Sequence, residues 1–294
     1  MAPVKLRRQN NIKTIQASLA IEGNTLNIEQ VTDIFEGKRI IGAKKDIIEV
    51  RNAILVYENF DNLNPLSIRD LLSAHKILMK DLVEESGNWR GRGVGIFKGA
   101  KITHVAPSAN RVPSLMKDLF EYLKRDIETP WLIKACIFHY ELEFIHPFLD
   151  GNGRMGVLWH QLLLVKENSV FKYVCIEEMI KYSQEQYYRV LEECDQKGDS
   201  TIFIEYSLEQ ILIALEKYRN ATNPVVKDPL SRLNYAQKKF QNYWFSRKEY
   251  NAVFKNISSA TASRDLYLGL KQNILKIKGQ KNQARYQFVR ELLS

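Results

Sequence analysis

The stretch His146-Pro147-Phe148-Leu149-Asp150-Gly151-Asn152-Gly153-Arg154 decides how this chain is interpreted. The segment before it, Trp131–Ile145, is apolar nearly all round, and the segment after it, Met155–Lys166, is similar. Both patterns predict buried helices. Pro147 ends the first helix, and the two glycines let the loop aim its backbone N–H groups inward. The second helix adds unpaired N–H groups and the positive end of its dipole, so the sequence predicts an anion site suited to phosphate.

Three side chains of this loop suit a reaction at phosphorus. Arg154 carries a planar guanidinium that holds phosphate oxygens, and Asp150 is a hard oxygen ligand suited to Mg²⁺. His146 supplies an imidazole, whose unperturbed pKa of about 6.5 lets it accept a proton at neutral pH. Each residue alone is typical of an ordinary helix cap or turn. Their combination in one short loop predicts phosphoryl or nucleotidyl transfer.

Most of residues 1–220 carry helical patterns, which predicts a mainly α fold for this part of the chain. One expected helix, Leu66–Glu85, starts with Ser67 as its N-cap and Asp70 three residues later. The segment Val94–Val105 instead alternates around Gly99, which predicts a small β-hairpin packed on the helices. The other helices expected here are Val112–Asp126, Ser183–Gln196 and Thr201–Lys217.

Residues 221–229 contain two prolines and no periodicity, so they are expected to link a first domain, residues 1–220, to a second one, residues 230–294. The second segment has the pattern helix, turn, helix, hairpin, which is the layout of a winged helix. Its expected elements are the helices Arg247–Phe254 and Thr261–Lys271 and the strands Ile274–Ile277 and Ala284–Val289.

The positive charge of the chain is concentrated at its C-terminal end. Residues 230–294 carry 13 lysines and arginines against three acidic residues, whereas the rest of the chain has 30 basic and 31 acidic residues. This asymmetry indicates either a solvated basic surface or a polyanionic partner, and it favours DNA binding by residues 230–294. Arg264, on the expected recognition helix, is the side chain predicted to contact a base or a phosphate.

Composition indicates the kind of cellular compartment in which the protein works. The three cysteines, Cys136, Cys175 and Cys194, are widely spaced, which argues against a disulfide framework and a zinc site and suits a reducing compartment. We find no signal peptide and no apolar stretch long enough to span a membrane. We therefore expect a cytoplasmic protein that does not insert into membranes. The sequence leaves its oligomeric state open.

The loop resembles the signature of the Fic family, His-x-Phe-x-Asp/Glu-Gly-Asn-Gly-Arg, which 146–154 matches without a gap. The hairpin Val94–Val105 resembles the target-docking flap of that family, with Ile102, Thr103 and His104 on its edge. Tyr187 and Tyr188 resemble the aromatic wall of its adenine pocket. The resemblance implies a Fic-type helical bundle with a small β-hairpin flap, followed by a C-terminal winged helix-turn-helix domain.

The same resemblance implies AMP transfer from ATP to a Ser, Thr or Tyr hydroxyl of a target protein, or of the chain itself. His146 would deprotonate the hydroxyl, and Asp150 would hold Mg²⁺. Gly151, Asn152, Gly153 and Arg154 would bind the phosphates. The edge of the flap would bind the target by strand addition.

An N-terminal stretch, Ser18-Leu19-Ala20-Ile21-Glu22-Gly23, resembles the inhibitory motif of the family, placed on a helix expected at about residues 9–23. Ser18 and Glu22 share one helix face, and Gly23 ends the helix. The ordinary alternative is a surface helix with a glycine cap. By resemblance, Glu22 would enter the nucleotide site and obstruct ATP.

The chain departs from the family pattern at Val157, where the signature has a second arginine. Valine cannot bind a γ-phosphate or pair with Glu22. Glu22 then either pairs with Arg154, which we favour, or has no partner and lies outside the pocket. Two alternatives stay open. The loop could run a different reaction, such as AMP removal, phosphate transfer or use of another nucleotide. The chain could also be a nucleotide-binding regulator that binds DNA through its C-terminal domain.

Overall fold

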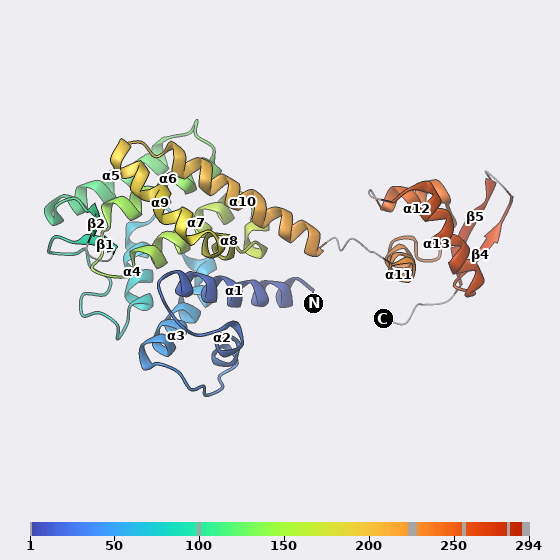
Figure 1. Cartoon of the computed structure of the whole chain (residues 1–294), viewed down its shortest axis with the longest axis horizontal. Coiled ribbons are helices and arrows are strands. Elements are labelled where there is room, and N and C mark those ends of the chain that lie inside the picture. Colours follow the sequence, from blue (N-terminus) through green and yellow to red (C-terminus); the bar gives the residue numbers. More distant parts are fainter. Residues whose placement is uncertain (1, 99–100, 223–227, 255–256, 281–282, 290–294) are drawn as a thin grey trace. The chain divides into compact units, whose positions relative to one another are not determined.

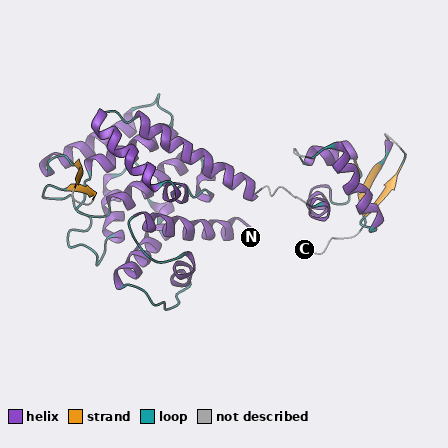
Figure 2. Cartoon of the chain, viewed as in Figure 1, coloured by secondary structure: helices purple, strands orange, loops and turns teal. Residues whose placement is uncertain are grey.

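The computed structural model describes residues 2–98, 101–222, 228–254, 257–280 and 283–289. Only the backbone is described for residues 2–6, 96–98, 101–104 and 221–222. The chain divides into two compact units, Met1–Tyr218 and Arg219–Ser294, which are considered separately below. Figure 2 shows that helices make up most of both units.

The first unit is a bundle of helices with one small hairpin (Figure 1). Its α-helices are α1 (Ala2–Ile21), α2 (Ile28–Phe35), α3 (Lys44–Glu58), α4 (Ile68–Leu78), α5 (Val112–Arg125), α6 (Trp131–Ile145), α7 (Asn152–Glu167), α8 (Glu177–Tyr182), α9 (Gln184–Lys197) and α10 (Thr201–Thr222). Short 3₁₀ turns lie at Phe60–Asn62, Ala109–Arg111 and Ser169–Tyr173.

The two helices that flank the loop 146–154 form the centre of this unit. Helices α6 and α7 pack against each other along their lengths, and their apolar side chains, including Phe138 and Trp159, are fully buried. This confirms the expectation that both helices are central and buried. The loop between them is therefore fixed at both ends by the core of the bundle.

The hairpin expected at residues 94–105 is present. Strand β1 (Gly95–Lys98) pairs antiparallel with β2 (Lys101–Val105), with a register shift between Ile96 and Phe97. Gly99 lies outside the described residues. Strand β2 packs next to α9, the helix that carries Tyr187 and Tyr188. The hairpin thus borders the same region of the bundle as the two tyrosines.

The helix expected at Leu66–Glu85 is shorter than predicted. Ser67 caps its start as expected, since its hydroxyl accepts a hydrogen bond from Asp70 N. The helix nevertheless ends at Leu78, because the side-chain amide of Asn52 on α3 donates to the carbonyls of Leu78 and Lys80. A tertiary contact therefore replaces the hydrogen bonds of the next helical turn.

Helix α1 starts earlier and ends slightly earlier than expected, and it lies on the bundle through α8, α2 and α3 (Figure 1). Its buried residues include Ile15 and Leu19. Beyond it, Gly23 adopts a φ of 90°, which turns the chain toward α2. In the described part of the chain, we find no helix whose length and apolar character would suit a membrane span.

The second unit has its own core. It contains α11 (Pro229–Phe240), β3 (Phe245–Ser246), α12 (Arg247–Val253), α13 (Ser259–Lys271), β4 (Leu275–Lys278) and β5 (Arg285–Phe288). The strands form an antiparallel sheet in the order β3-β5-β4. The elements expected here are present, together with α11 and the short strand β3, which the sequence did not predict. Helix α10 runs to Thr222, so the first two residues of the expected linker are helical.

A buried ion pair ties this unit together. Asp265 on α13 accepts hydrogen bonds from the guanidinium of Arg232 on α11 at 2.5 and 2.7 Å, and both side chains are buried. Tyr250 on α12 donates to the same carboxylate at 3.2 Å. One acidic residue of this basic segment is thus used to join three helices, and its charge does not reach the surface.

Candidate active site

The loop between α6 and α7 has an unusual backbone at both ends. His146 is the C-cap of α6 and adopts a left-handed conformation, with φ 49° and ψ 59°. Gly151 is the N-cap of α7, with φ 86°. A Cβ atom at Gly151 would also lie 2.6 Å from the sulfur of Met79, so only glycine fits this position. The sharp turn brings the imidazole of His146 and the start of α7 into the same loop.

The first N–H groups of α7 have no partner within the helix, because its hydrogen bonds begin at Met155. The first hydrogen bond of the helix runs from Met155 N to the carbonyl of Gly151 at 3.0 Å. The N–H groups of Asn152, Gly153 and Arg154 precede it, so they are the donors that a helix leaves open to an anion. The side chain of Asn152 points elsewhere. It exchanges two hydrogen bonds of 2.9 Å with the backbone of Phe148 and braces the loop.

His146 is half-buried, and a hydrogen bond orients its ring. Its Nδ1 lies 3.3 Å from the carbonyl of Glu143. A carbonyl only accepts, so this contact places the ring proton on Nδ1 and leaves Nε2 as the basic nitrogen. The residue is therefore arranged as a proton acceptor.

Two residues that the sequence did not single out hold this loop in place. The buried guanidinium of Arg90 donates to the carbonyls of His146 at 2.7 Å and Ile145 at 3.2 Å, and to those of Arg92 and Pro107. His75 on α4 stacks on Phe148 with 3.7 Å between ring centroids. Its Nδ1 accepts from Gly87 N, so its Nε2 donates to the carbonyl of Asp150 at 3.0 Å. Burial lowers the pKa of His75 to about 4, which keeps this ring neutral and structural.

Arg154 is buried at the start of α7 and bound by two carboxylates. Its guanidinium lies 3.1 Å from Glu49 Oε1 and 2.9 Å from Asp150 Oδ1. Asp150 Oδ1 also accepts from Gly151 N at 2.6 Å. Glu49 on α3 is thus a partner of Arg154 that the sequence did not single out, and the pairing of Glu22 with Arg154 stays a prediction, with Arg154 close enough to offset part of the rise that desolvation causes in the pKa of Glu22. Glu49 lies in a different part of the sequence, and its role had no local signal.

Glu49 also connects Arg154 to the turn after α1. Its Oε2 accepts a hydrogen bond of 2.7 Å from the side chain of Asn24. Asn24 in turn follows Gly23 directly, at the end of the expected inhibitory motif. The position of this turn is thus coupled to the arginine of the loop by two hydrogen-bonded contacts.

The carboxylate of Glu22 reaches the glycine face of α7. A Cβ atom at Gly153 would overlap Glu22 Oε1, so the carboxylate lies directly over that backbone. Glu22 as a whole residue is solvent-exposed. The protein around its carboxylate nevertheless desolvates this group and raises the pKa of Glu22. The positive charge of Arg154 partly offsets the increase in this pKa. The carboxylate of Glu22 therefore lies against the first turn of α7.

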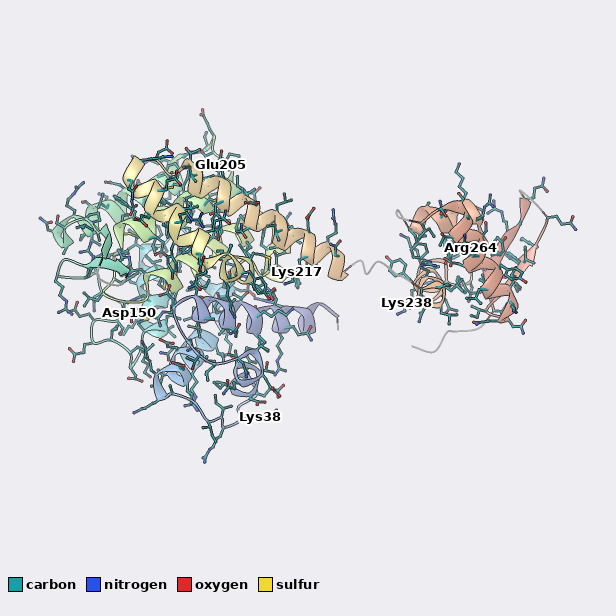
Figure 3. All side chains as sticks on the ribbon, viewed as in Figure 1. Lys38, Asp150, Glu205, Lys217, Lys238 and Arg264 are labelled. Atoms are coloured by element: carbon teal, nitrogen blue, oxygen red, sulfur yellow. The ribbon has the colours of Figure 1, made fainter. Side chains whose placement is uncertain are left out.

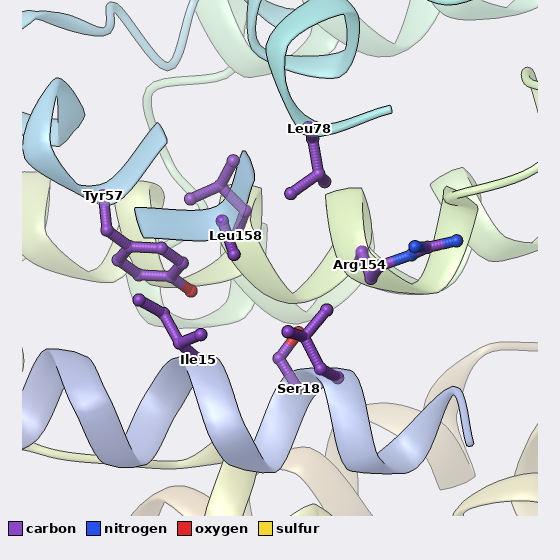
Figure 4. Close-up of a pocket in the computed structure, with 8 residues that line it drawn as sticks. Ile15, Ser18, Tyr57, Leu78, Arg154 and Leu158 are labelled. Atoms are coloured by element: carbon purple, nitrogen blue, oxygen red, sulfur yellow. The ribbon is translucent and has the colours of Figure 1, made fainter. Parts of the chain in front are cut away.

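Ser18 lies one turn earlier on α1 and is buried. It lines a small cavity together with Ile15, Tyr57, Leu78, Arg154 and Leu158, as Figure 4 shows. In this view α1 runs beneath α7, with Ser18 and Arg154 bordering the same space. Val157 is also buried, so the position of the missing second arginine is part of the apolar packing of α7.

The two tyrosines of α9 differ in their surroundings. Tyr187 is buried, and its hydroxyl lies 3.2 Å from Nε2 of His139 on α6. Tyr188 is 39% exposed, and its hydroxyl donates to the carbonyl of Ile21 at 3.4 Å. Tyr188 therefore faces the end of α1 next to Glu22, while Tyr187 supports it from behind. The side chains of Ile102, Thr103 and His104, expected on the flap edge, lie outside the described residues.

Comparison with known proteins identifies the family of the chain. The model of the Fic/DOC family matches residues 65–164. A crystal structure of a Fic family protein from Desulfovibrio desulfuricans G20 is 39% identical, with a TM-score of 0.71, and covers 99% of this chain and 89% of that chain. The chain belongs to the Fic family. A structure of Fic-1 from C. elegans is 25% identical, with a TM-score of 0.61, over 72% of this chain and 63% of that one.

Curated relatives within the Fic family carry the name protein adenylyltransferase. The protein adenylyltransferase fic-1 of Caenorhabditis elegans is 26% identical over 230 residues, which is 74% of this chain and 43% of the relative. The protein adenylyltransferase Fic of Culex quinquefasciatus is 27% identical over 232 residues, or 74% of this chain and 44% of the relative. The chain thus spans less than half the length of these two relatives.

Proposed function

We propose that this protein is a protein adenylyltransferase that moves AMP from ATP to a Ser, Thr or Tyr hydroxyl of a target protein. The observation that carries the proposal is the loop 146–154, in which a proton-accepting imidazole and the open N–H groups of α7 are held together. The names of the curated relatives support the same reaction.

The arrangement suggests how each group acts. Nε2 of His146 takes the proton of the target hydroxyl, and the oxygen attacks the α-phosphorus of ATP. The bond from that phosphorus to the β,γ-diphosphate breaks, and pyrophosphate leaves. The N–H groups of Asn152, Gly153 and Arg154 stabilise the charge on the phosphate oxygens. Base and anion site are both fixed by the core, so the two groups are preorganised.

Asp150 is the residue that would hold Mg²⁺. Its side chain is 43% exposed, and Arg154 binds its Oδ1 but not its Oδ2. Among the described residues, no three His, Cys, Asp or Glu side chains lie close enough together to bind a metal ion by themselves. A single carboxylate nevertheless fits Mg²⁺, which keeps waters and takes substrate phosphate oxygens as further ligands. The ion would supply charge neutralisation at the phosphates.

Exchanging Asp150 for alanine should remove the Mg²⁺ dependence of AMP transfer together with most of the activity. The carboxylate is the one acidic side chain of the loop 146–154. Initial rates across a Mg²⁺ titration measure this, and Asp81→Ala, outside the loop, is the matched control. A variant that keeps the wild-type Mg²⁺ response would place the ligand elsewhere.

Binding of the target is proposed at the outer edge of the hairpin. Strand β2 has the sequence Lys101–Val105 and pairs with β1 through one edge. A target segment that adds to the free edge would be held by its backbone, so its side-chain hydroxyl can vary. The neighbouring α9 places this edge close to the expected nucleotide wall. The proposed targets are another protein and the chain itself.

Incubation of the full chain with α-labelled ATP and Mg²⁺, with and without cell lysate, tests the reaction. We expect labelled protein whose mass has increased by one AMP group. An added phosphate, another nucleotide, or release of AMP from a modified protein would assign the loop to one of the rival reactions. Absence of any labelled or altered protein would contradict an enzymatic role.

A second candidate function is DNA binding by the unit Arg219–Ser294, proposed as a winged-helix domain. Arg264 is exposed on α13, and Figure 3 shows it and Lys238 on this unit. On strand β4, Lys276 and Lys278 lie over the ring of Trp244, at 5.5 and 4.2 Å from its centroid. With Asp265 buried against Arg232, the exposed face of α13 is basic and aromatic.

Duplex DNA should bind the full chain with a steep salt dependence, because basic side chains release counterions when they contact phosphates. Arg264→Ala should weaken binding and lower the slope of log affinity against log salt by about one. Fluorescence anisotropy at several salt concentrations measures both. Lys38→Ala, an exposed change in the first unit, is the control. No binding even at low salt would leave the unit as a protein-docking module.

A further inference from the structure

Glu143 is a buried carboxyl group that the proposed reaction does not use. It lies on α6 one turn before His146, and the residue is 8% exposed. Its Oε1 has no hydrogen-bond partner among the described residues, and the nearest imidazole, His139 Nε2, is 3.8 Å away. Burial raises the pKa of Glu143 to about 8, and the charge of Glu22 adds to this effect. A buried carboxyl oxygen without a hydrogen bond costs stability, so we looked for a ligand that would pair with it.

The surroundings of Glu143 show which way it faces. Gly153 and Gly156 are one turn apart on α7, and the carboxylate of Glu22 covers the first of them. Glu143 covers the second, since a Cβ atom at Gly156 would lie 2.6 Å from Glu143 Oε1. Glu22 and Glu143 therefore lie side by side along one glycine face.

The tyrosines of α9 border the same space. Burial raises the pKa of Tyr187, and the nearby Glu143 adds to that increase. The pKa of Tyr188 is likewise raised by burial, then by Glu22 and by Glu143. The hydroxyl of Tyr187 lies 3.2 Å from His139 Nε2, which is itself 3.8 Å from Glu143 Oε1, so Glu143 lies on the tyrosine side of the glycine face.

The proposed reaction needs a place for the sugar of its nucleotide. With a phosphate on the N–H groups at the start of α7 and a base against Tyr188, the ribose would lie between them, beside Glu143. Carboxyl groups recognise ribose through its hydroxyls, which both donate and accept hydrogen bonds. A protonated carboxyl suits the place better than an ionised one, because it does not repel the adjacent phosphates.

We propose that Glu143 is a specificity residue that hydrogen-bonds the ribose hydroxyls of the nucleotide and selects ribonucleotides over deoxyribonucleotides. The inference rests on the proposed function, since it needs a nucleotide in this site. The ribose would supply the hydrogen bond that Glu143 Oε1 lacks, and it would enter only after Glu22 has moved away from Gly153.

Binding measurements on the full chain test it. In the double variant Glu22→Gly, His146→Ala, which frees the site and blocks turnover, isothermal titration compares ATP with 2′-deoxyATP and 3′-deoxyATP in the presence of Mg²⁺. We expect ATP to bind about three- to tenfold more tightly than at least one deoxy analogue, the effect of one hydrogen bond. Adding Glu143→Val should abolish this ratio, while Glu143→Gln, whose amide also donates and accepts, should keep most of it.

Thermal unfolding separates this role from a structural one. If Glu143 serves recognition, the valine variant should be at least as stable as its parent and lose only the discrimination. Equal affinities for ATP and both analogues, or an unchanged ratio in the valine variant, would overturn the ribose assignment and leave the proposed reaction standing. If no nucleotide binds to the parent double variant, the proposed function itself fails and the ribose assignment with it.

Discussion

Replacing His146 with alanine is expected to reduce AMP transfer by about 10²- to 10⁴-fold, the usual effect of losing a general base. The ring contacts the carbonyl of Glu143 through Nδ1, so its other nitrogen is the basic one. Nucleotide binding should persist, because the phosphate donors are backbone groups of α7. Transfer rates and nucleotide affinity, measured on the same preparation, separate the two effects.

His146→Asn is the matched control for this experiment. Asparagine keeps a polar side chain at the left-handed end of α6, a conformation that it tolerates well, but it cannot accept a proton. We expect it to be as inactive as the alanine variant. Near wild-type transfer by either variant would remove His146 from the mechanism.

Substituting Glu22 with glycine is expected to raise AMP transfer, including self-modification, by about tenfold or more, equivalent to about 1.4 kcal/mol of relieved competition. The carboxylate lies over Gly153, where it would obstruct the proposed phosphate position by its size and its charge. Glu22→Gln keeps the size and removes the charge, so it should activate less than glycine. Initial rates at saturating Mg²⁺ measure the difference.

The variant Val157→Arg completes the test of inhibition by Glu22. With Glu22 present, the new arginine should strengthen inhibition by pairing with it, and with Glu22 removed it should increase activity by binding the γ-phosphate. Rates of the wild type, both single variants and the double variant give the coupling between the two positions. If wild type and Glu22→Gly react at the same rate, Glu22 is not inhibitory, and the catalytic proposal is unaffected.

The sequence predicted the central helices, the loop between them and the hairpin because each depends on neighbouring residues. A proline, two glycines and the apolar runs on either side suffice to define a buried helix–loop–helix. The cap at Ser67 was predictable for the same reason. The early end of α4 was not, since it depends on the amide of Asn52 from another helix.

The same limit applies to the candidate site. His146, Asp150 and Arg154 are contiguous, whereas Glu49 and Arg90 come from distant segments. Nothing in the sequence around Glu49 indicates that this glutamate pairs with Arg154. The sequence therefore predicted which side chains share the loop, and it missed the buried partners, Glu49 and Arg90, that hold them.

The contacts of Arg90 have a consequence for how the target specificity of such a protein can diversify. Every acceptor of its guanidinium is a main-chain carbonyl, from Arg92, before the hairpin, through Pro107, after it, to Ile145 and His146. Peptide carbonyls are the same whatever side chains surround them. Through Arg90, both ends of the hairpin are thus anchored to the backbone of His146 in a way that does not depend on the sequence of the hairpin. We therefore expect that residues 95–105 can be exchanged for another hairpin sequence while the distance from the hairpin to His146 is kept.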